Sequence, residues 1–319
     1  MKNIILIGTG QMARDYYLVL KSLQVNVQVV GRGEENAKAF YEQFGVMPTI
    51  GGVENYLSLT GETFDAAIIA VGVDVIKNTA EALLKFGCTN ILLEKPGGVD
   101  FNEVKELALI STSYNAKIYV AYNRRFYKSV YHLKRLVEDD GGILSGNFEF
   151  TEWSHIIKDL KLSDVIKKNL FFTNSTHVLD LAFLLMGKPV EFNSFVLGDC
   201  GWHKPSIFVG SGMTDKNILF SYSANWESAG SWGIEINTSK RRLILRPMEK
   251  LFEQRLGELK ACELHLEDTF SEDLFKPGLL RQVQAFLFGW DSSVLKTLDE
   301  QVKDISWMSK ILTGCDDAF

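Results

Sequence analysis

The sequence is short of basic residues, of proline and of long apolar runs. It has 34 Lys and Arg against 40 Asp and Glu, which gives a formal net charge of −6. An acidic chain is poorly suited to binding the phosphate backbone of a nucleic acid, so we expect no nucleic-acid partner. Only 6 prolines and 26 glycines occur in 319 residues, which excludes a fibrous or low-complexity chain.

The four cysteines, Cys88, Cys200, Cys262 and Cys315, form no Cys-x-x-Cys pair. Zinc knuckles and thioredoxin-type sites need such pairs, so we expect neither, and no bound metal. Scattered cysteines in a long chain are typical of reduced thiols, which predicts a cytoplasmic protein. The apolar run that starts at Ile4 is too short for a signal peptide, and no stretch approaches the roughly 18 apolar residues of a membrane span.

Apolar strand patterns and helical patterns alternate in the first part of the chain. The expected strands are 4–7, 25–30, 64–71, 90–93 and 117–121. Several are apolar throughout, as in a sheet that is buried on both faces. Amphipathic helical patterns separate them. Repeated β-α-β units of this length predict a doubly wound parallel sheet with right-handed crossovers.

From about Arg124 the pattern changes to β-rich segments with short links, which predicts a mostly antiparallel sheet. The expected strands are 146–153, 190–197, 206–210, 218–226, 233–237 and 242–246. Helices are expected near 127–138, 174–186, 278–288 and 293–312. The sequence therefore predicts an α/β protein of two domains, 1–123 with the parallel sheet and 124–319 with the antiparallel sheet.

The segment Gly8-Thr9-Gly10-Gln11-Met12-Ala13 lies between the first expected strand and the first expected helix. In dinucleotide-binding folds the first glycine of such a turn allows a tight bend and the second lets the backbone approach a pyrophosphate. A small third residue packs the helix closely on the sheet, and backbone N–H groups at the helix N-terminus bind the phosphates. The position of the segment favours a nucleotide site over a purely structural glycine turn.

The end of the second expected strand bears on the choice between NAD and NADP. Folds selective for NAD place Asp or Glu there to bind the ribose 2′-hydroxyl. Here the sequence is Gly31-Arg32-Gly33, with no carboxylate before Glu34. Arg32 can pair with a 2′-phosphate that no anion repels, so we expect NADP in preference to NAD. The alternative is a solvated Arg32 and an enzyme that accepts either cofactor.

Glu94-Lys95-Pro96 follows the expected strand 90–93, at the edge of a parallel sheet where such folds bind ligands. A lysine there can donate a hydrogen bond to a substrate hydroxyl or carbonyl and stabilise its more negative form. An ordinary surface lysine before a turn is the alternative.

A helix is expected to place Thr173, Asn174, His177 and Asp180 on one face. A histidine with polar neighbours is a candidate proton acceptor near neutral pH. A lone helical histidine is also common as a structural residue, so periodicity alone leaves both roles open.

Four motifs occur in an order that is typical of one family. They are Gly8-x-Gly10-x-x-Ala13, Glu94-Lys95-Pro96, Tyr122-Asn123-Arg124-Arg125-Phe126 and His177-x-x-Asp180. Together they resemble the glucose–fructose oxidoreductase/inositol dehydrogenase (Gfo/Idh/MocA) family, and their order and spacing agree across most of the chain. The later segment Lys276-Pro277-Gly278, with Gln282 and Phe286, is also similar to that family's substrate domain.

This resemblance implies an N-terminal Rossmann domain and a C-terminal α/β domain whose sheet forms a homo-oligomer interface on its open face. Lys95 matches the family lysine that contacts the substrate and the nicotinamide ribose, and His177 matches the general acid/base. Family members often have Asp four residues before this histidine, whereas here Thr173 occupies that position and Asn174 follows. Asn174 can take over orientation of the substrate, but it cannot accept a proton.

We therefore expect an NAD(P)-dependent dehydrogenase or reductase acting on the CH–OH group of a sugar, a cyclitol or a sugar-derived molecule, including nucleotide-linked ones. The expected catalytic residues are Lys95, His177 and Asn174, and the expected substrate-binding residues are these three and Arg125. The expected cofactor contacts are Gly8, Thr9, Gly10, Gln11, Met12, Arg32, Val71, Glu94 and Lys95. The alternatives are a reductase of a non-sugar substrate and a non-catalytic dinucleotide sensor.

Overall fold

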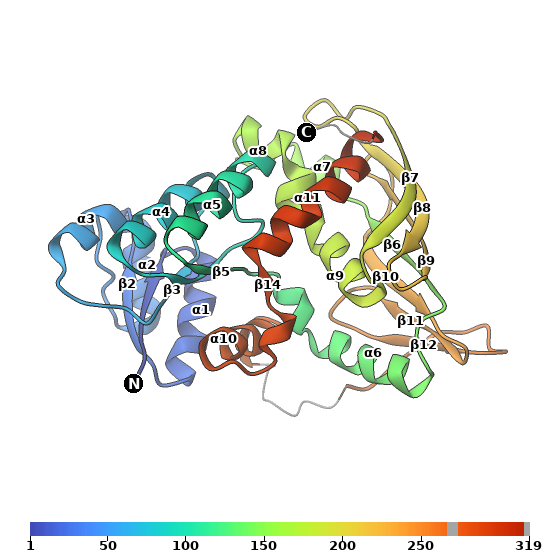
Figure 1. Ribbon diagram of the computed structural model, residues 1–319, viewed down its shortest axis with the longest axis horizontal. Helices are drawn as coiled ribbons and strands as arrows, with labels where there is room; N and C mark the ends of the chain where they lie inside the picture. The colour runs from blue at the N-terminus through green and yellow to red at the C-terminus, as the bar shows by residue number, and fades with distance from the viewer. Residues whose placement is uncertain (267–273, 316–319) are drawn as a thin grey trace. The chain divides into compact units, whose positions relative to one another are not determined.

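The computed structural model describes residues 1–266 and 274–315 (Figure 1). The chain divides into two compact units. The first contains Met1–Asn123 and Glu272–Lys303, and the second contains Arg124–Ser271 and Asp304–Phe319. Sequence analysis assigned all of 124–319 to one domain. Glu272–Lys303 belongs instead to the first unit, because it adds a strand to that unit's sheet and a helix against its first helix.

The first unit is built on a six-stranded sheet with the order β14-β5-β4-β3-β1-β2. The strands are β1 (Asn3–Ile7), β2 (Asn26–Val30), β3 (Ala66–Ile69), β4 (Asn90–Leu93), β5 (Lys117–Val120) and β14 (Lys296–Thr297). The first five are parallel, and β14 pairs antiparallel with β5. Residues at the centres of β1, β3 and β4 are fully buried, as their apolar runs predict.

Helices connect these strands. They are α1 (Gln11–Ser22), α2 (Glu34–Phe44), α3 (Val53–Leu59), α4 (Ile76–Phe86), α5 (Phe101–Ser113) and α10 (Leu279–Phe288). The Asp100 side chain caps α5 by accepting hydrogen bonds from the backbone N–H groups of Asn102 and Glu103. Sequence analysis missed α3, whose two turns are too short to show a clear period.

The second unit contains an eight-stranded sheet with the order β13-β12-β11-β10-β6-β9-β8-β7. The strands are β6 (Ser145–Phe150), β7 (Pro189–Leu197), β8 (Ile207–Thr214), β9 (Leu219–Asn225), β10 (Trp232–Asn237), β11 (Arg241–Leu245), β12 (Phe252–Arg255) and β13 (Cys262–Glu263). All neighbours are antiparallel except β6 and β9, which are parallel. Sequence analysis missed β12 and β13, which are short and rich in polar residues.

The helices of the second unit are α6 (Lys128–Asp139), α7 (Ser154–Ile157), α8 (Asp164–Lys168) and α9 (Thr176–Met186), and a π-helical turn (Phe171–Ser175) precedes α9. Helix α9 packs on β6 and is buried almost throughout. Alternate residues of β6 and β9 face it, so that Phe148 contacts both Tyr222 and Phe183, with ring centroids 5.3 and 5.4 Å away. This aromatic core fixes α9 against the sheet.

Helix α11 (Leu298–Thr313) ends the described chain, and the division between the two units falls within it. Among residues 1–266 and 274–315, no helix combines the length and the hydrophobicity needed to span a bilayer. The predicted α/β class is confirmed, with a parallel sheet near the N-terminus and a larger, mostly antiparallel sheet in the second unit.

Candidate active site

Glycine allows the turn between β1 and α1 to approach the ends of the neighbouring strands. Gly8 has a φ of +122°, and a Cβ at this position would lie 2.2 Å from the carbonyl oxygen of Ala70, just beyond β3. Only glycine tolerates both this φ and this approach. A Cβ at Gly31, just beyond β2, would lie 2.6 Å from Cγ2 of Thr9. The turn is therefore enclosed by the carboxyl ends of two strands.

The N-terminus of α1 is open at this turn. Its N-cap residue, Gly10, offers no side chain to the first backbone N–H groups, and the first helical turn contains no acidic residue. A Cβ at Gly10 would have nothing within 4 Å. Free N–H groups and the partial positive charge of the helix terminus attract an anion. The donors and the open space suit the pyrophosphate of a dinucleotide.

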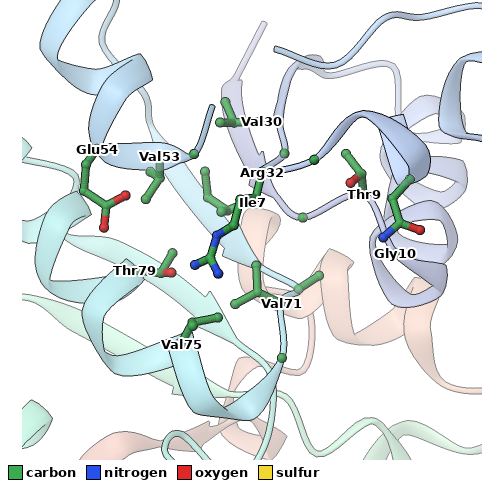
Figure 2. Close-up of a pocket in the computed structure, with 17 residues that line it drawn as sticks. Ile7, Thr9, Gly10, Val30, Arg32, Val53, Glu54, Val71, Val75 and Thr79 are labelled. Atoms are coloured by element: carbon green, nitrogen blue, oxygen red, sulfur yellow. The ribbon is translucent and has the colours of Figure 1, made fainter. Parts of the chain in front are cut away.

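A cavity of about 280 Å³ extends from this turn along the ends of β1, β2 and β3. Figure 2 shows the guanidinium of Arg32 pointing into it, on the side of Thr79. The expected cofactor residues that line the cavity are Gly8, Thr9, Gly10, Arg32 and Val71. Those outside its lining are Gln11, Met12, Glu94 and Lys95.

The Glu94-Lys95-Pro96 turn at the end of β4 is held by buried hydrogen bonds. The Tyr16 hydroxyl, from α1, donates to Oε1 of Glu94 over 2.9 Å and lies 3.3 Å from Oε1 of Gln282 in α10. Burial raises the pKa of Glu94, and the nearby charge of Lys95 opposes that rise. This network fixes the residue directly before Lys95.

A second contact holds the same turn from α11. The side-chain amide of Gln301 donates to the carbonyl oxygen of Pro96 over 3.2 Å and to the Tyr122 hydroxyl over 3.0 Å. Gln301 is fully buried. Both residues that brace the turn from the late part of the chain belong to Glu272–Lys303, which explains why this segment packs with the first unit.

In the second unit, Arg125 forms a buried ion pair. Its Nε and Nη2 each donate over 2.7 Å, to Oδ2 and Oδ1 of Asp180 in α9. This planar two-point contact fixes the helix that contains His177. Arg125 was expected to bind substrate, and in the structure its buried guanidinium is paired with Asp180.

A π-helical turn precedes α9 at residues where a regular helix was predicted. Sequence analysis placed Asn174, His177 and Asp180 together on a regular helix. A π turn is wider than an α turn, and the structure gives Asn174 and Asp180 different partners. Thr173 is buried, whereas Asn174 lines a cavity, so Asn174 is the residue available to a ligand.

This second cavity, of about 290 Å³, lies at the end of β6 and the start of β10, two central strands of the eight-stranded sheet. Strands β6 and β10 pair with Phe150 opposite Trp232, so the residues after β6 and before β10 meet there. The lining residues are Thr151, Glu152, Trp153, Ile156, Ile157, Asn174, Ser231 and Trp232. Half of these lining residues are apolar and half are polar, a mixture that suits a small polar molecule.

Glu152 supplies a carboxylate to this cavity. It is buried, and its Oε1 and Oε2 accept from Nδ2 of Asn174 over 3.2 and 3.1 Å, while Oε1 also accepts from the Ser175 hydroxyl over 2.7 Å. An ionised carboxylate only accepts, so Asn174 must present its NH₂ group to it. Oδ1 of Asn174 has no hydrogen-bond partner among the described residues and can accept from a ligand hydroxyl.

His177 lies beside the same cavity, with its imidazole centroid 5.9 Å from that of the Trp232 ring. It is buried, and it belongs to the second unit together with Asn174. Lys95 belongs to the first unit. In residues 1–266 and 274–315, no three His, Cys, Asp or Glu side chains gather as a metal site requires.

Comparison with known families identifies the first unit. Residues 2–122 match the model of an oxidoreductase family with an NAD-binding Rossmann fold. The matched model is that of the Gfo/Idh/MocA family. The predicted resemblance is confirmed, and the Gly8–Gly10 turn and its cavity lie within the matched residues. No curated protein matches the chain.

Solved structures extend the likeness over both units. UDP-N-acetylglucosamine 3-dehydrogenase GnnA from Acidithiobacillus ferrooxidans is 14% identical with a TM-score of 0.73, covering 99% of this chain and 98% of that one. An inositol dehydrogenase homolog from Azotobacter vinelandii, complexed with NAD+, is 13% identical with a TM-score of 0.74, covering 98% and 95%. The dehydrogenase MviM from Clostridium difficile is 17% identical with a TM-score of 0.75, covering 98% and 99%. At these low sequence identities, the structural likeness establishes a shared fold and nothing more.

Sequence analysis missed two residues of the site. Tyr16 was assigned to the apolar face of α1, and its hydroxyl contact with Glu94 spans 78 residues. Glu152 follows a strand in no recognisable motif, and its contact with Asn174 spans 22 residues. The indication available in the sequence was the absence of Asp at position 173, which suggests that a carboxylate has to come from elsewhere.

Proposed function

We propose that this oxidoreductase transfers a hydride between a nicotinamide cofactor and the CH–OH or carbonyl group of a sugar, a cyclitol or a sugar-derived substrate, including nucleotide-linked ones. The observation behind this proposal is the open turn at Gly8 and Gly10, which has the space and the backbone donors for a pyrophosphate. The Asn174 amide and the Glu152 carboxylate suit a substrate with several hydroxyl groups.

NADP is proposed as the preferred cofactor. Arg32 lines the cavity and forms no ion pair with any described residue, and the residues around it at the end of β2 are Val30, Gly31 and Gly33. A 2′-phosphate could pair with the guanidinium in two-point geometry. Glu54 is an acidic residue of the same cavity lining, so the preference is expected to be partial rather than absolute.

The proposed catalytic residues are Lys95, His177 and Asn174. When bound, the nicotinamide donates or accepts the hydride. Lys95 would donate a hydrogen bond to the reacting oxygen of the substrate and stabilise negative charge on it. His177 would take the hydroxyl proton during oxidation and return it during reduction. Asn174 would accept a hydrogen bond from a neighbouring substrate hydroxyl through Oδ1 and so hold the reacting carbon in position.

A homo-oligomer is proposed to form through the open face of the antiparallel sheet. Phe195 of β7 and Val209 of β8 are cross-strand neighbours, and their side chains are 72% and 50% exposed. Leu197 and Leu219 are also largely exposed. Large apolar side chains gathered on a strand surface favour contact with another protein surface. A cytoplasmic location is proposed from the four cysteines, none of which is paired.

Fluorescence titration with NADPH and NADH tests the cofactor, followed by turnover assays with myo-inositol, D-glucose and UDP-N-acetylglucosamine. We expect both nucleotides to bind, NADPH more tightly, and at least one polyol or sugar to change the absorbance of the nicotinamide. A protein that binds neither nucleotide would contradict the proposal. Nucleotide binding without turnover on a wider panel of polyols and sugars would favour the sensor function instead.

A further inference from the structure

Arg124 is a half-buried cation without a carboxylate partner in the described part of the chain. Its guanidinium carbon lies 4.9 Å from the Trp232 ring centroid and 5.9 Å from that of Tyr127. Its Nε is buried and has no hydrogen-bond partner among the residues that the structure describes. Within residues 1–266 and 274–315, no carboxylate lies within ion-pair distance of it. Two aromatic rings thus position a charge that no described acidic residue neutralises.

The other arginines of the second unit differ from Arg124. Five of them form ion pairs with Asp or Glu side chains: Arg125, Arg241, Arg242, Arg246 and Arg255. Arg135, on α6, also lacks such a pair in the described chain, but it is exposed and water can solvate it. Arginine stays charged at every physiological pH, so a partly desolvated guanidinium is strongly favoured to bind an anion.

Trp232 connects this cation to the candidate substrate site. The indole contacts the Arg124 guanidinium, lies 5.9 Å from the His177 ring and forms part of the cavity lining. The acidic member of the lining is Glu152, which accepts hydrogen bonds from Asn174 and Ser175. A ligand in the cavity would therefore meet hydrogen-bonding groups near Asn174, and the Trp232 ring that lines the cavity also contacts the guanidinium of Arg124.

We propose that Arg124 binds an oxyanion, either a carboxylate or a phosphate, on the substrate of this enzyme. This proposal rests on the proposed function and narrows its substrate class to acidic sugars and sugar phosphates, including nucleotide sugars. The guanidinium suits both groups, because its planar N–H fork matches two oxygens of either one. The indole and the phenol ring keep that fork in a fixed orientation.

The test compares three sugars as probes: D-glucose, D-glucuronate and D-glucose 6-phosphate. Their binding to the full chain saturated with NADPH is measured by calorimetry for the wild type, Arg124→Gln, Arg124→Lys and Arg135→Gln. We expect the wild type to bind at least one anionic sugar about tenfold or more tightly than glucose, as a charge-assisted hydrogen bond implies. Which anionic sugar binds distinguishes a carboxylate from a phosphate.

Arg124→Gln should abolish this preference, and Arg124→Lys should retain part of it, because lysine keeps the charge and loses the fork. Arg135→Gln removes one positive charge from the same unit and should behave as wild type. Equal binding of all three sugars to the wild type, or an unchanged preference in Arg124→Gln, would overturn the proposal. Thermal unfolding of each variant identifies any folding defect. If Arg124→Gln is less stable than wild type, the sugar preference of Arg124→Lys is compared with that of wild type instead.

The NADPH titration separates the two hypotheses. A chain that binds no nucleotide contradicts the proposed function, and the same sugars are then tested on the chain alone. Normal nucleotide binding with no preference for anionic sugars contradicts only the role of Arg124. The preference for anionic sugars should also weaken as the salt concentration is raised from about 0.05 to 0.5 M, because ions screen the attraction between a partly exposed Arg124 and the oxyanion of the sugar.

Discussion

Replacing Gly10 with alanine should separate folding from nucleotide binding. Gly10 has a φ of −73° and a ψ of −173°, which alanine adopts without strain, and its Cβ would meet nothing within 4 Å. Alanine also restricts the unfolded chain, so the variant should be as stable as wild type or more stable by about 0.4–1 kcal/mol. The added methyl group would occupy the space that a pyrophosphate needs at the N-terminus of α1.

The expected loss of nucleotide binding follows from that overlap. Forcing a methyl group into an occupied space costs about 1–3 kcal/mol, which is about a 5- to 150-fold increase in Kd for NADPH. Urea unfolding measures the stability, and fluorescence titration measures the Kd. If Gly10→Ala binds NADPH as tightly as wild type does, the pyrophosphate does not approach α1 at this turn and the reasoning is refuted.

Gly8→Ala is the matched control for this experiment. Its Cβ would lie 2.2 Å from the carbonyl oxygen of Ala70, and the φ of +122° is unfavourable for alanine. We expect a loss of about 3 kcal/mol or more in the free energy of unfolding. The two neighbouring glycines should therefore fail in different ways, one through folding and the other through binding.

Three further predictions concern single side chains. Arg32→Ala should weaken the binding of NADPH by about tenfold and leave the binding of NADH nearly unchanged. Equal losses of affinity for both nucleotides would show that Arg32 does not select the cofactor. His177→Ala should lower turnover by about 10²- to 10⁴-fold with unchanged nucleotide affinity, and normal turnover would contradict its proton-transfer role. For Asp140, burial raises the pKa, but hydrogen bonds from Thr238 and Arg241 outweigh it and lower the pKa overall. The stabilisation by ionised Asp140 is therefore present above the ordinary pKa of Asp and is lost as the pH falls through the lowered pKa. Asp140→Asn should be less stable than wild type at neutral pH, and its stability in urea unfolding should depend less on acid pH.

Residue order was sufficient to predict the central parallel sheet and the nucleotide turn. The runs at Ile4–Ile7 and Ile91–Leu93 are buried because an uninterrupted apolar run can only be accommodated between two covered faces. Gly8 and Gly10 follow the first run directly, so their location at the carboxyl end of β1 follows from local sequence alone. The Glu94-Lys95-Pro96 turn was located by the same reasoning.

The contacts that orient the candidate catalytic groups could not be predicted in this way. Glu152 and Asn174 are 22 residues apart, and Arg125 and Asp180 are 55 apart. Neither pair has a local period, because each depends on how a helix packs over a sheet. The regular helix predicted over 173–180 is found only from Thr176, since Phe171–Ser175 form a π-helical turn.

The sequence by itself determined the alternation of strands and helices, the open glycine turn and the residue types available for chemistry, because burial and backbone conformation leave periodic or short-range patterns. Tertiary structure alone decided that Glu272–Lys303 joins the first unit, that Asn174 rather than Thr173 lines the cavity, and that Arg125 is neutralised while Arg124 has no acidic partner among the described residues. The physical reason is that ion pairing and cavity lining are set by distances in space between residues far apart in the chain.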